Sequence, residues 1–103
     1  MGFKVIWTET ALADLAEICA HIAADNPSAA DRMGLEILDH VEIRATFPLI
    51  GPNYPRGSHG TLREIVVRPY RIFYDTFEDR SSVEILHVWH GAREEPKFHN
   101  QVP

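Results

Sequence analysis

The sequence predicts an α+β domain with the element order β-α-α-β-β-β. Two observations predict it: two segments with helical spacing of apolar residues come first, and three short β-rich runs separated by turn-forming residues follow them. Charged and aromatic side chains alternate with apolar ones in these runs. This alternation indicates a small sheet with one buried face and one face available for contact.

The first elements can be placed by apolar periodicity and by helix-capping residues. A short strand is expected from Phe3 to Trp7, with alternate residues on one side. Thr8 is a suitable N-cap for the following helix, which ends near residues 25–27. Its buried stripe is expected to hold Ala11, Leu12, Leu15, Ile18, Cys19 and Ile22.

A second helix is expected to begin at Ser28 and to end before Pro48, forming a helical hairpin with the first. Residues 48–60 are rich in glycine and proline, which predicts a loop. The buried stripe of this helix is expected to hold Ala30, Met33, Ile37, Val41 and Ala45.

The β-rich region begins with a hairpin that turns at residues 68–69. A turn there pairs Val67 with Tyr70, and the pairing continues outward to Glu64 and Phe73. The core face then holds Ile65, Val67, Tyr70, Ile72 and Tyr74, and the other face holds Glu64, Val66, Arg71, Phe73 and Asp75. A third strand at residues 83–89 is apolar on both sides, so its orientation stays open and a central position is plausible.

Size and charge limit the functional classes. The 103 residues suffice for one domain, 1–103, whose last ~10 residues are expected to form a loosely ordered tail. The formal charge is −5 and lysine occurs only twice, which favours a protein partner over nucleic acid. No signal peptide or membrane-spanning run is recognisable, so a cytoplasmic protein is expected.

Cofactor and metal chemistry have little support in the sequence, and none is expected. His87 and His90 are three residues apart on a predicted strand and should point to opposite faces, which does not suit one metal ion. Cys19 cannot form an intramolecular disulfide, and its place on a helix stripe indicates a buried, inert thiol. No nucleophile motif or phosphate-binding loop is present.

Arg71 is the strongest candidate for a functional residue. An arginine in the middle of a strand either forms an ion pair, here with Glu64 or Asp75, or contacts a partner. His90 and Arg93 at the end of the last strand are weaker candidates, with an ordinary turn around Gly91 as the alternative. Phe73 joins them because it shares the face of Arg71.

The combined pattern resembles the RelE/ParE superfamily of toxins from type II toxin–antitoxin modules. The matching segments cover nearly the whole chain in order; they are Val5–Trp7, Ala11–Leu15, Asn26–Ala30, Pro48–Gly51, Arg63–Ile65, Pro69–Tyr74 and His90–Arg93. The resemblance implies a helical hairpin packed on one face of a small, mostly antiparallel sheet.

Two branches of this superfamily differ in the residues of the open sheet face. The RelE-like branch cuts messenger RNA on the ribosome, and its pattern has lysines where this chain has Glu64 and Val66. The RelE-like pattern also has a tyrosine in the tail, where this chain has only Phe98 and His99 nearby. In the usual His-Gly-Arg-Arg ending, this chain has Ala92 in place of the first arginine. These departures favour the ParE-like branch, which is associated with plasmid stabilisation and with inhibition of DNA gyrase by direct protein contact.

The resemblance therefore implies a ParE-like toxin that a cognate antitoxin neutralises by wrapping it with a segment that is disordered when free. Partner-binding candidates are Arg71, Phe73, Glu64, His90 and Arg93. The alternative is a RelE-like, ribosome-dependent endoribonuclease, with Arg71, His90, Arg93 and His99 as its catalytic candidates and RNA as its substrate. A degenerate, non-toxic member that only binds an antitoxin is a further alternative.

Overall fold

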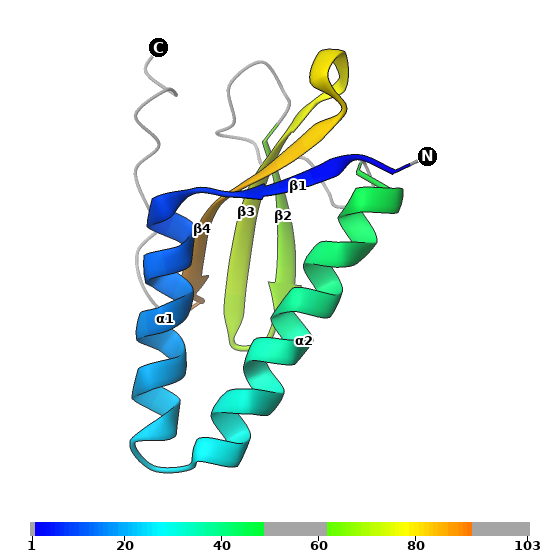
Figure 1. The fold of residues 1–103 in the computed structure, drawn as a ribbon. Helices are drawn as coiled ribbons and strands as arrows, with labels where there is room; N and C mark the ends of the chain where they lie inside the picture. Colours follow the sequence, from blue (N-terminus) through cyan, green and yellow to red (C-terminus); the bar gives the residue numbers. More distant parts are fainter. Residues whose placement is uncertain (1, 49–61, 92–103) are drawn as a thin grey trace.

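A computed structural model describes residues 2–48 and 62–91, and it has the element order expected from the sequence (Figure 1). Residues 49–60 of the predicted loop and the predicted tail lie outside the described residues. The elements are β1 (Lys4–Trp7), α1 (Glu9–Ala23), α2 (Pro27–Thr46), β2 (Leu62–Val67), β3 (Tyr70–Phe77), the short 3₁₀ helix η2 (Glu78–Arg80) and β4 (Ser82–His90).

The four strands form one mixed sheet in the order β1-β4-β3-β2. β1 runs parallel to β4, whereas β3 is antiparallel to both β4 and β2. The two helices lie side by side on one face of the sheet, with α1 over β4 and α2 over β1 and β2 (Figure 1). The predicted α+β fold and the central position of the last strand are both confirmed.

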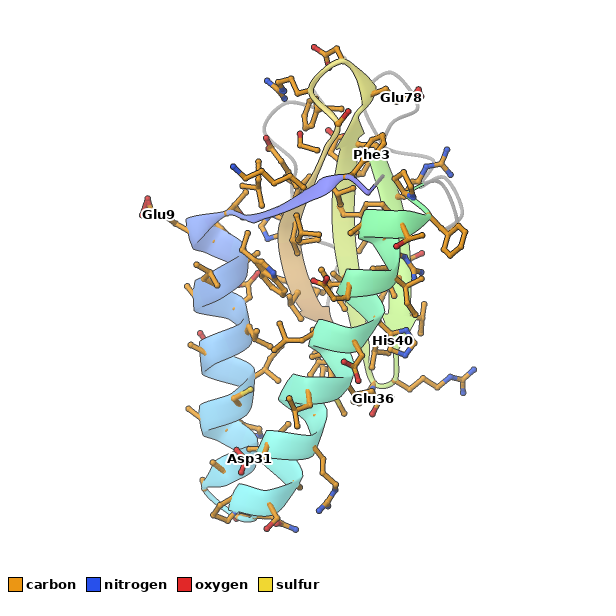
Figure 2. All side chains as sticks on the ribbon, turned by 45° about the vertical axis from the view of Figure 1, so that its right-hand side comes forward. Phe3, Glu9, Asp31, Glu36, His40 and Glu78 are labelled. Atoms are coloured by element: carbon orange, nitrogen blue, oxygen red, sulfur yellow. The ribbon has the colours of Figure 1, made fainter. Side chains whose placement is uncertain are left out.

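The start of α1 follows the prediction closely. The Thr8 hydroxyl accepts a hydrogen bond from the Ala11 backbone N–H at 3.1 Å, which satisfies one free donor of the first turn. Glu9 lies in the first turn of α1 and is exposed (Figure 2). Its negative charge complements the positive end of the helix dipole. Leu12 was expected in the buried stripe, but 52% of it is exposed because it lies on the outer side of α1.

The start of α2 corrects one prediction. Ser28 is not the N-cap; the Asn26 side chain accepts from the Ala29 N–H at 3.1 Å, and Pro27 occupies the first helical turn. Proline is well suited there because its missing N–H would have no partner in the helix. The predicted stripe is otherwise present, with Ile37 and Val41 almost fully buried. Cys19 on α1 is half-buried rather than enclosed.

The hairpin of β2 and β3 has the predicted register. Val67 pairs with Tyr70, Val66 with Arg71, Ile65 with Ile72 and Glu64 with Phe73. The turn is at Arg68-Pro69, and the peptide bond between them is cis. Ile65, Val67, Tyr70, Ile72 and Tyr74 are all buried beneath the helices, as predicted for the core face.

A β-bulge in β4 decides the orientation that alternation left open. Tyr74 pairs with Ile85 but Phe73 pairs with His87, so Leu86 is an extra residue between them. Because the extra residue reverses the alternation, Val83, Ile85 and Val88 all point into the same core. Phe3 and Val5 pack against that core from the edge of the sheet. Neither helix in the described ranges has the length and hydrophobicity that a membrane crossing requires.

Candidate functional site

The face of the sheet opposite the helices carries an ion pair at its centre. Arg71 on β3 donates from Nε to the Glu64 carboxylate on β2, and the two side chains are 23% and 18% exposed. The two residues stand one diagonal step apart, which is the geometry that the sequence predicted. Arg71 is therefore accessible at the surface, with its charge largely matched by a neighbouring carboxylate.

The ion pair rests on a small apolar cluster. The Arg71 guanidinium carbon lies 5.1 Å from the centre of the Phe73 ring, a distance typical of a cation–π contact. Phe73 shares the face of Arg71 as predicted, but it is fully buried together with Leu62, against Leu86 and Trp89. Phe73 therefore lies beneath Arg71 in the free protein, and its contact with a partner stays a prediction.

His90 does not lie beside Arg71. It pairs with Tyr70, whose side chain faces the helices, and the two rings meet edge to face at 5.5 Å. Trp89 is the residue that pairs with Arg71. The structure thus places His87 on the face of Arg71 and His90 on the opposite face. The sequence left the orientation of this strand open, and the register now places His90 on the helix face.

The turn after His90 holds the end of β4 against the β2–β3 hairpin. The Gly91 N–H donates to the Pro69 carbonyl at 2.7 Å. A Cβ at position 91 would lie 2.9 Å from that carbonyl oxygen, closer than side chains normally approach. Glycine is needed for this close approach, which supports the turn interpretation of the His-Gly pair. Arg93 and His99 lie outside the described residues.

A cavity of about 180 Å³ lies between α1 and the ends of β3 and β4, on the helix face of the sheet. It is lined by Asp14, Glu17, Ile18, His21, Tyr70, Val88, Trp89 and His90. Within the described ranges, no three Asp, Glu, His or Cys side chains are placed to hold one metal ion.

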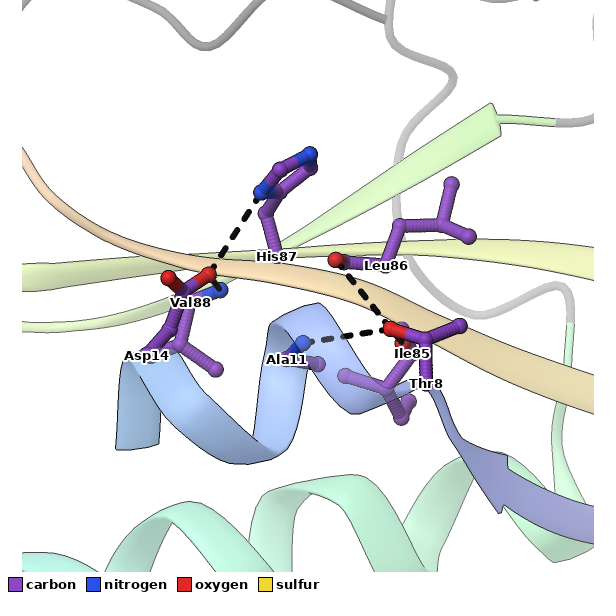
Figure 3. A network of polar contacts seen from close by, with 7 residues as sticks. All are labelled: Thr8, Ala11, Asp14, Ile85, Leu86, His87 and Val88. Atoms are coloured by element: carbon purple, nitrogen blue, oxygen red, sulfur yellow. Dashed lines mark hydrogen bonds and ion pairs between the residues drawn. The ribbon is translucent and has the colours of Figure 1, made fainter. Parts of the chain in front are cut away.

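Side chains from α1 complete the edge of β4 where β1 leaves the sheet (Figure 3). β1 pairs with β4 only as far as Ile85, whose carbonyl then accepts from both the Thr8 backbone N–H at 3.2 Å and the Thr8 hydroxyl at 2.7 Å. Beyond the bulge, the Asp14 carboxylate accepts from the Val88 N–H at 3.0 Å and lies 3.4 Å from His87 Nδ1. Asp14 therefore takes the place of the missing strand partner.

We expect Asp14→Ala to destabilise the protein by about 1–3 kcal/mol, because a partly buried backbone donor would lose its acceptor. Asp14→Asn keeps an acceptor oxygen and should cost less. Urea unfolding followed by circular dichroism measures both. Glu17→Ala removes the same charge from an exposed position on α1 and should stay within about 0.5 kcal/mol of the parent. Equal stability of the Asp14 and Glu17 variants would contradict the proposed role of Asp14.

Sequence reasoning missed two polar residues that the structure singles out, Asp14 and Arg44. Arg44 on α2 is only 9% exposed, although arginine is rarely buried. A signal was present, because Arg44 follows Val41 by three residues and so falls on the buried stripe of α2. Asp14 gave no comparable signal, since its partner is a backbone group on a distant strand.

Comparison with known sequences gives one family and two named relatives. Residues 5–95 match the family model described as the ParE toxin of the type II toxin–antitoxin system parDE. The chain is 38% identical over 91 residues to the protein named Toxin RelE2 of Caulobacter vibrioides, covering 87% of this chain and 97% of that one. It is 36% identical over 96 residues to Y4kP of Sinorhizobium fredii, covering 91% and 94%.

Solved structures share the fold. A chain from the chromosomal ParDE system of P. aeruginosa superposes with a TM-score of 0.69 at 20% identity, over 85% of this chain and 95% of that chain. A chain of the RelBE2 toxin–antitoxin complex from Mycobacterium tuberculosis superposes with a TM-score of 0.65 at 22% identity, over 87% of this chain and 99% of that chain. The isolated RelE toxin of E. coli superposes with a TM-score of 0.58 at 19% identity, over 90% of this chain and 88% of that chain. With the family match over residues 5–95, the chain belongs to the ParE toxin family of type II toxin–antitoxin systems.

Proposed function

We propose that this toxin arrests growth by direct contact with an essential protein, inferred to be DNA gyrase, and not by cutting RNA. The observation that carries this proposal is the ion pair between Arg71 and Glu64. A guanidinium that is held by a carboxylate has little positive charge left to stabilise a phosphate in a transition state.

The charges around the ion pair support the same proposal. On the sheet face opposite the helices, the described strands contribute three carboxylates, those of Glu64, Asp75 and Glu84, and two cations, Lys4 and Arg71. Phosphate binding needs a surplus of positive charge, and the described strand residues of this face carry no such surplus. Val66, the cross-strand neighbour of Arg71, is 56% exposed and offers apolar surface instead. Apolar surface beside an arginine is typical of the centre of protein interfaces.

We further propose that a cognate antitoxin neutralises the toxin by laying an apolar segment along the helical hairpin. A shallow groove of about 680 Å³ runs between α1 and α2, where the small residues Ala20, Ala23, Ala30 and Gly34 leave room. Leu35 and Leu38 border it and are 62% and 43% exposed. Two of the similar solved structures belong to toxin–antitoxin systems, the ParDE system and the RelBE2 complex, which supports a partner of this kind. An amphipathic helix in a groove is the expected mode of binding.

Inducible expression tests the proposed target. We expect growth arrest accompanied by a DNA damage response, with protein synthesis continuing in the first minutes after induction. Co-expression with the small open reading frame adjacent to the toxin gene should restore growth, and the two products should co-purify.

The opposite outcomes are equally specific. Codon-specific cuts in ribosome-bound messenger RNA that disappear in Arg71→Ala would establish the nuclease alternative and overturn our proposal. Normal growth during induction, combined with antitoxin binding, would identify a non-toxic member.

A further inference from the structure

Arg44 is a buried cation near the end of α2, and no carboxylate of residues 2–48 or 62–91 neutralises it. The residue is 9% exposed. Its Nη1 donates to the carbonyl of His40, one turn earlier on the helix, at a long 3.3 Å (Figure 2 labels His40). Its Nε is buried and has no acceptor within the described part of the chain. Most of the hydrogen-bonding capacity of this guanidinium is therefore unused.

No carboxylate of the described residues forms an ion pair with Arg44. The helix cannot supply one, because the positions three and four residues away in both directions are His40, Val41, Phe47 and Pro48. The nearest charged neighbour on α2 in sequence, Glu42, is two residues away and so points to another side of the helix. Of the segments outside the described ranges, residues 49–61, which follow α2 in the sequence, contain no Asp or Glu, and residues 92–103 contain Glu94 and Glu95.

The compensation that Arg44 does receive is weak. Its guanidinium carbon lies 6.0 Å from the centre of the Tyr74 ring, at the outer limit of a cation–π contact. A buried arginine with a distant ring and a single long hydrogen bond is costly for the isolated fold. An arginine in such a position is better explained by a counter-charge that arrives with a partner.

The surface beside Arg44 indicates what kind of partner this is. Ile43 precedes Arg44 on α2, and Phe47, the C-cap residue of α2, follows Arg44 by three residues; they are 43% and 59% exposed. Exposed isoleucine and phenylalanine fit apolar side chains of a polypeptide better than a phosphate backbone. The ligand expected here is therefore a peptide that carries a carboxylate next to apolar residues.

We propose that Arg44 is a specificity site for the antitoxin: an Asp or Glu of the bound antitoxin segment pairs with its guanidinium, while flanking apolar residues cover Ile43 and Phe47. This inference rests on the proposed neutralisation by an antitoxin. It adds the chemical identity of one contact and places that contact at the end of α2, away from the groove beside Leu35 and Leu38.

The test compares antitoxin affinity with the stability of the free toxin, using the full-length proteins. Arg44→Met keeps the length of the side chain and removes the charge. We expect the affinity for the cognate antitoxin to fall at least about 30-fold, because a desolvated charge pair loses one partner. The urea midpoint of the free toxin should stay the same or rise, because a buried charge without a counter-charge is removed. Arg44→Lys should bind with intermediate affinity, since it keeps the charge but loses the planar fork.

Arg32→Met is the matched control. Arg32 lies on the same helix and is exposed, so its loss should change the affinity by less than about threefold. In addition, one Asp→Asn or Glu→Gln substitution in the antitoxin segment should weaken binding to the parent toxin but not to Arg44→Met. That pattern identifies the carboxylate that pairs with Arg44.

Three results would overturn the inference while leaving neutralisation intact: parent-like affinity of Arg44→Met, a parallel loss of affinity and stability, or an equal loss in Arg32→Met. Stabilisation of the parent but not of Arg44→Met by inorganic phosphate would assign the site to a phosphate ligand and also overturn it. If the parent toxin itself fails to bind the antitoxin, the proposed neutralisation fails together with this inference.

Discussion

Cells that express Arg71→Ala should grow through induction, whereas cells that express the parent toxin stop. Arg71 lies at the centre of the sheet face that we assign to the target, and arginine is among the residues that contribute most to protein interfaces. A loss of about 2–4 kcal/mol in binding corresponds to an affinity roughly 30- to 1,000-fold weaker. Growth curves at matched expression levels, together with pull-down of the target, measure this effect.

Arg80→Ala is the control for the charge change. Arg80 lies at the tip between β3 and β4, 57% of its side chain is exposed, and its 3.8 Å ion pair with Glu84 contributes little. Growth arrest by Arg80→Ala should equal that of the parent.

Glu64→Gln distinguishes the two candidate mechanisms that both use Arg71, which are contact with a protein target and cleavage of RNA. It releases the guanidinium from its counter-charge without changing the size of the side chain. In a protein-binding toxin, arrest should remain close to the parent level, because Arg71 stays in place. RNA cleavage that appears or increases in Glu64→Gln would mean that the carboxylate had been masking a phosphate-binding site, and would contradict our assignment of the target.

Tyr74→Ala should largely unfold the protein. Tyr74 is fully buried at the centre of β3, and its hydroxyl donates to the Pro48 carbonyl at 3.1 Å, so the ring joins the sheet to the end of α2. Removing a buried aromatic ring costs about 3–5 kcal/mol, a large part of the total stability of a small domain. Circular dichroism and urea unfolding should show a strongly reduced midpoint, and toxicity should be lost with the fold.

Tyr74→Phe is the matched variant, because it keeps the ring and removes the hydroxyl. We expect it to cost about 1 kcal/mol and to leave growth arrest unchanged. If Tyr74→Ala unfolded at the same urea concentration as Tyr74→Phe, the ring would not have the central packing role that its burial indicates.

Local patterns predicted most of the fold. The register of β2 and β3 followed from the turn at residues 68–69 and from the alternation on each strand, because one buried face allows one register. Thr8 is predictable as an N-cap because threonine carries a hydroxyl that can accept from a backbone N–H of the first turn, and the structure shows that hydrogen bond. Asn26 and Ser28 are both good caps, and the nearby Pro27 could have decided between them, since proline suits the first turn.

Non-local contacts could not be predicted. The bulge at Leu86 depends on the pairing of β4 with β3, and no residue type within β4 indicates its position. Its effect is large, because the residues after it change faces. The bulge also decides that His87, rather than His90, lies on the sheet face of Arg71. The burial of Phe73 likewise depends on Leu62 and Trp89, which come from other strands.

The strand order has a consequence for synthesis. Among the described strands, β4 is the last in sequence, yet it lies between β1, the first, and the β2–β3 hairpin, so no other described strand joins these two parts of the sheet before residues 82–90 have left the ribosome. Strand pairs that are distant in sequence, such as β1 and β4, form slowly. Until they form, the incomplete chain exposes unpaired strand edges. The sheet face that we assign to the target is therefore incomplete until β4 has been made, which leaves time for an antitoxin already present in the cell to meet the chain as it folds.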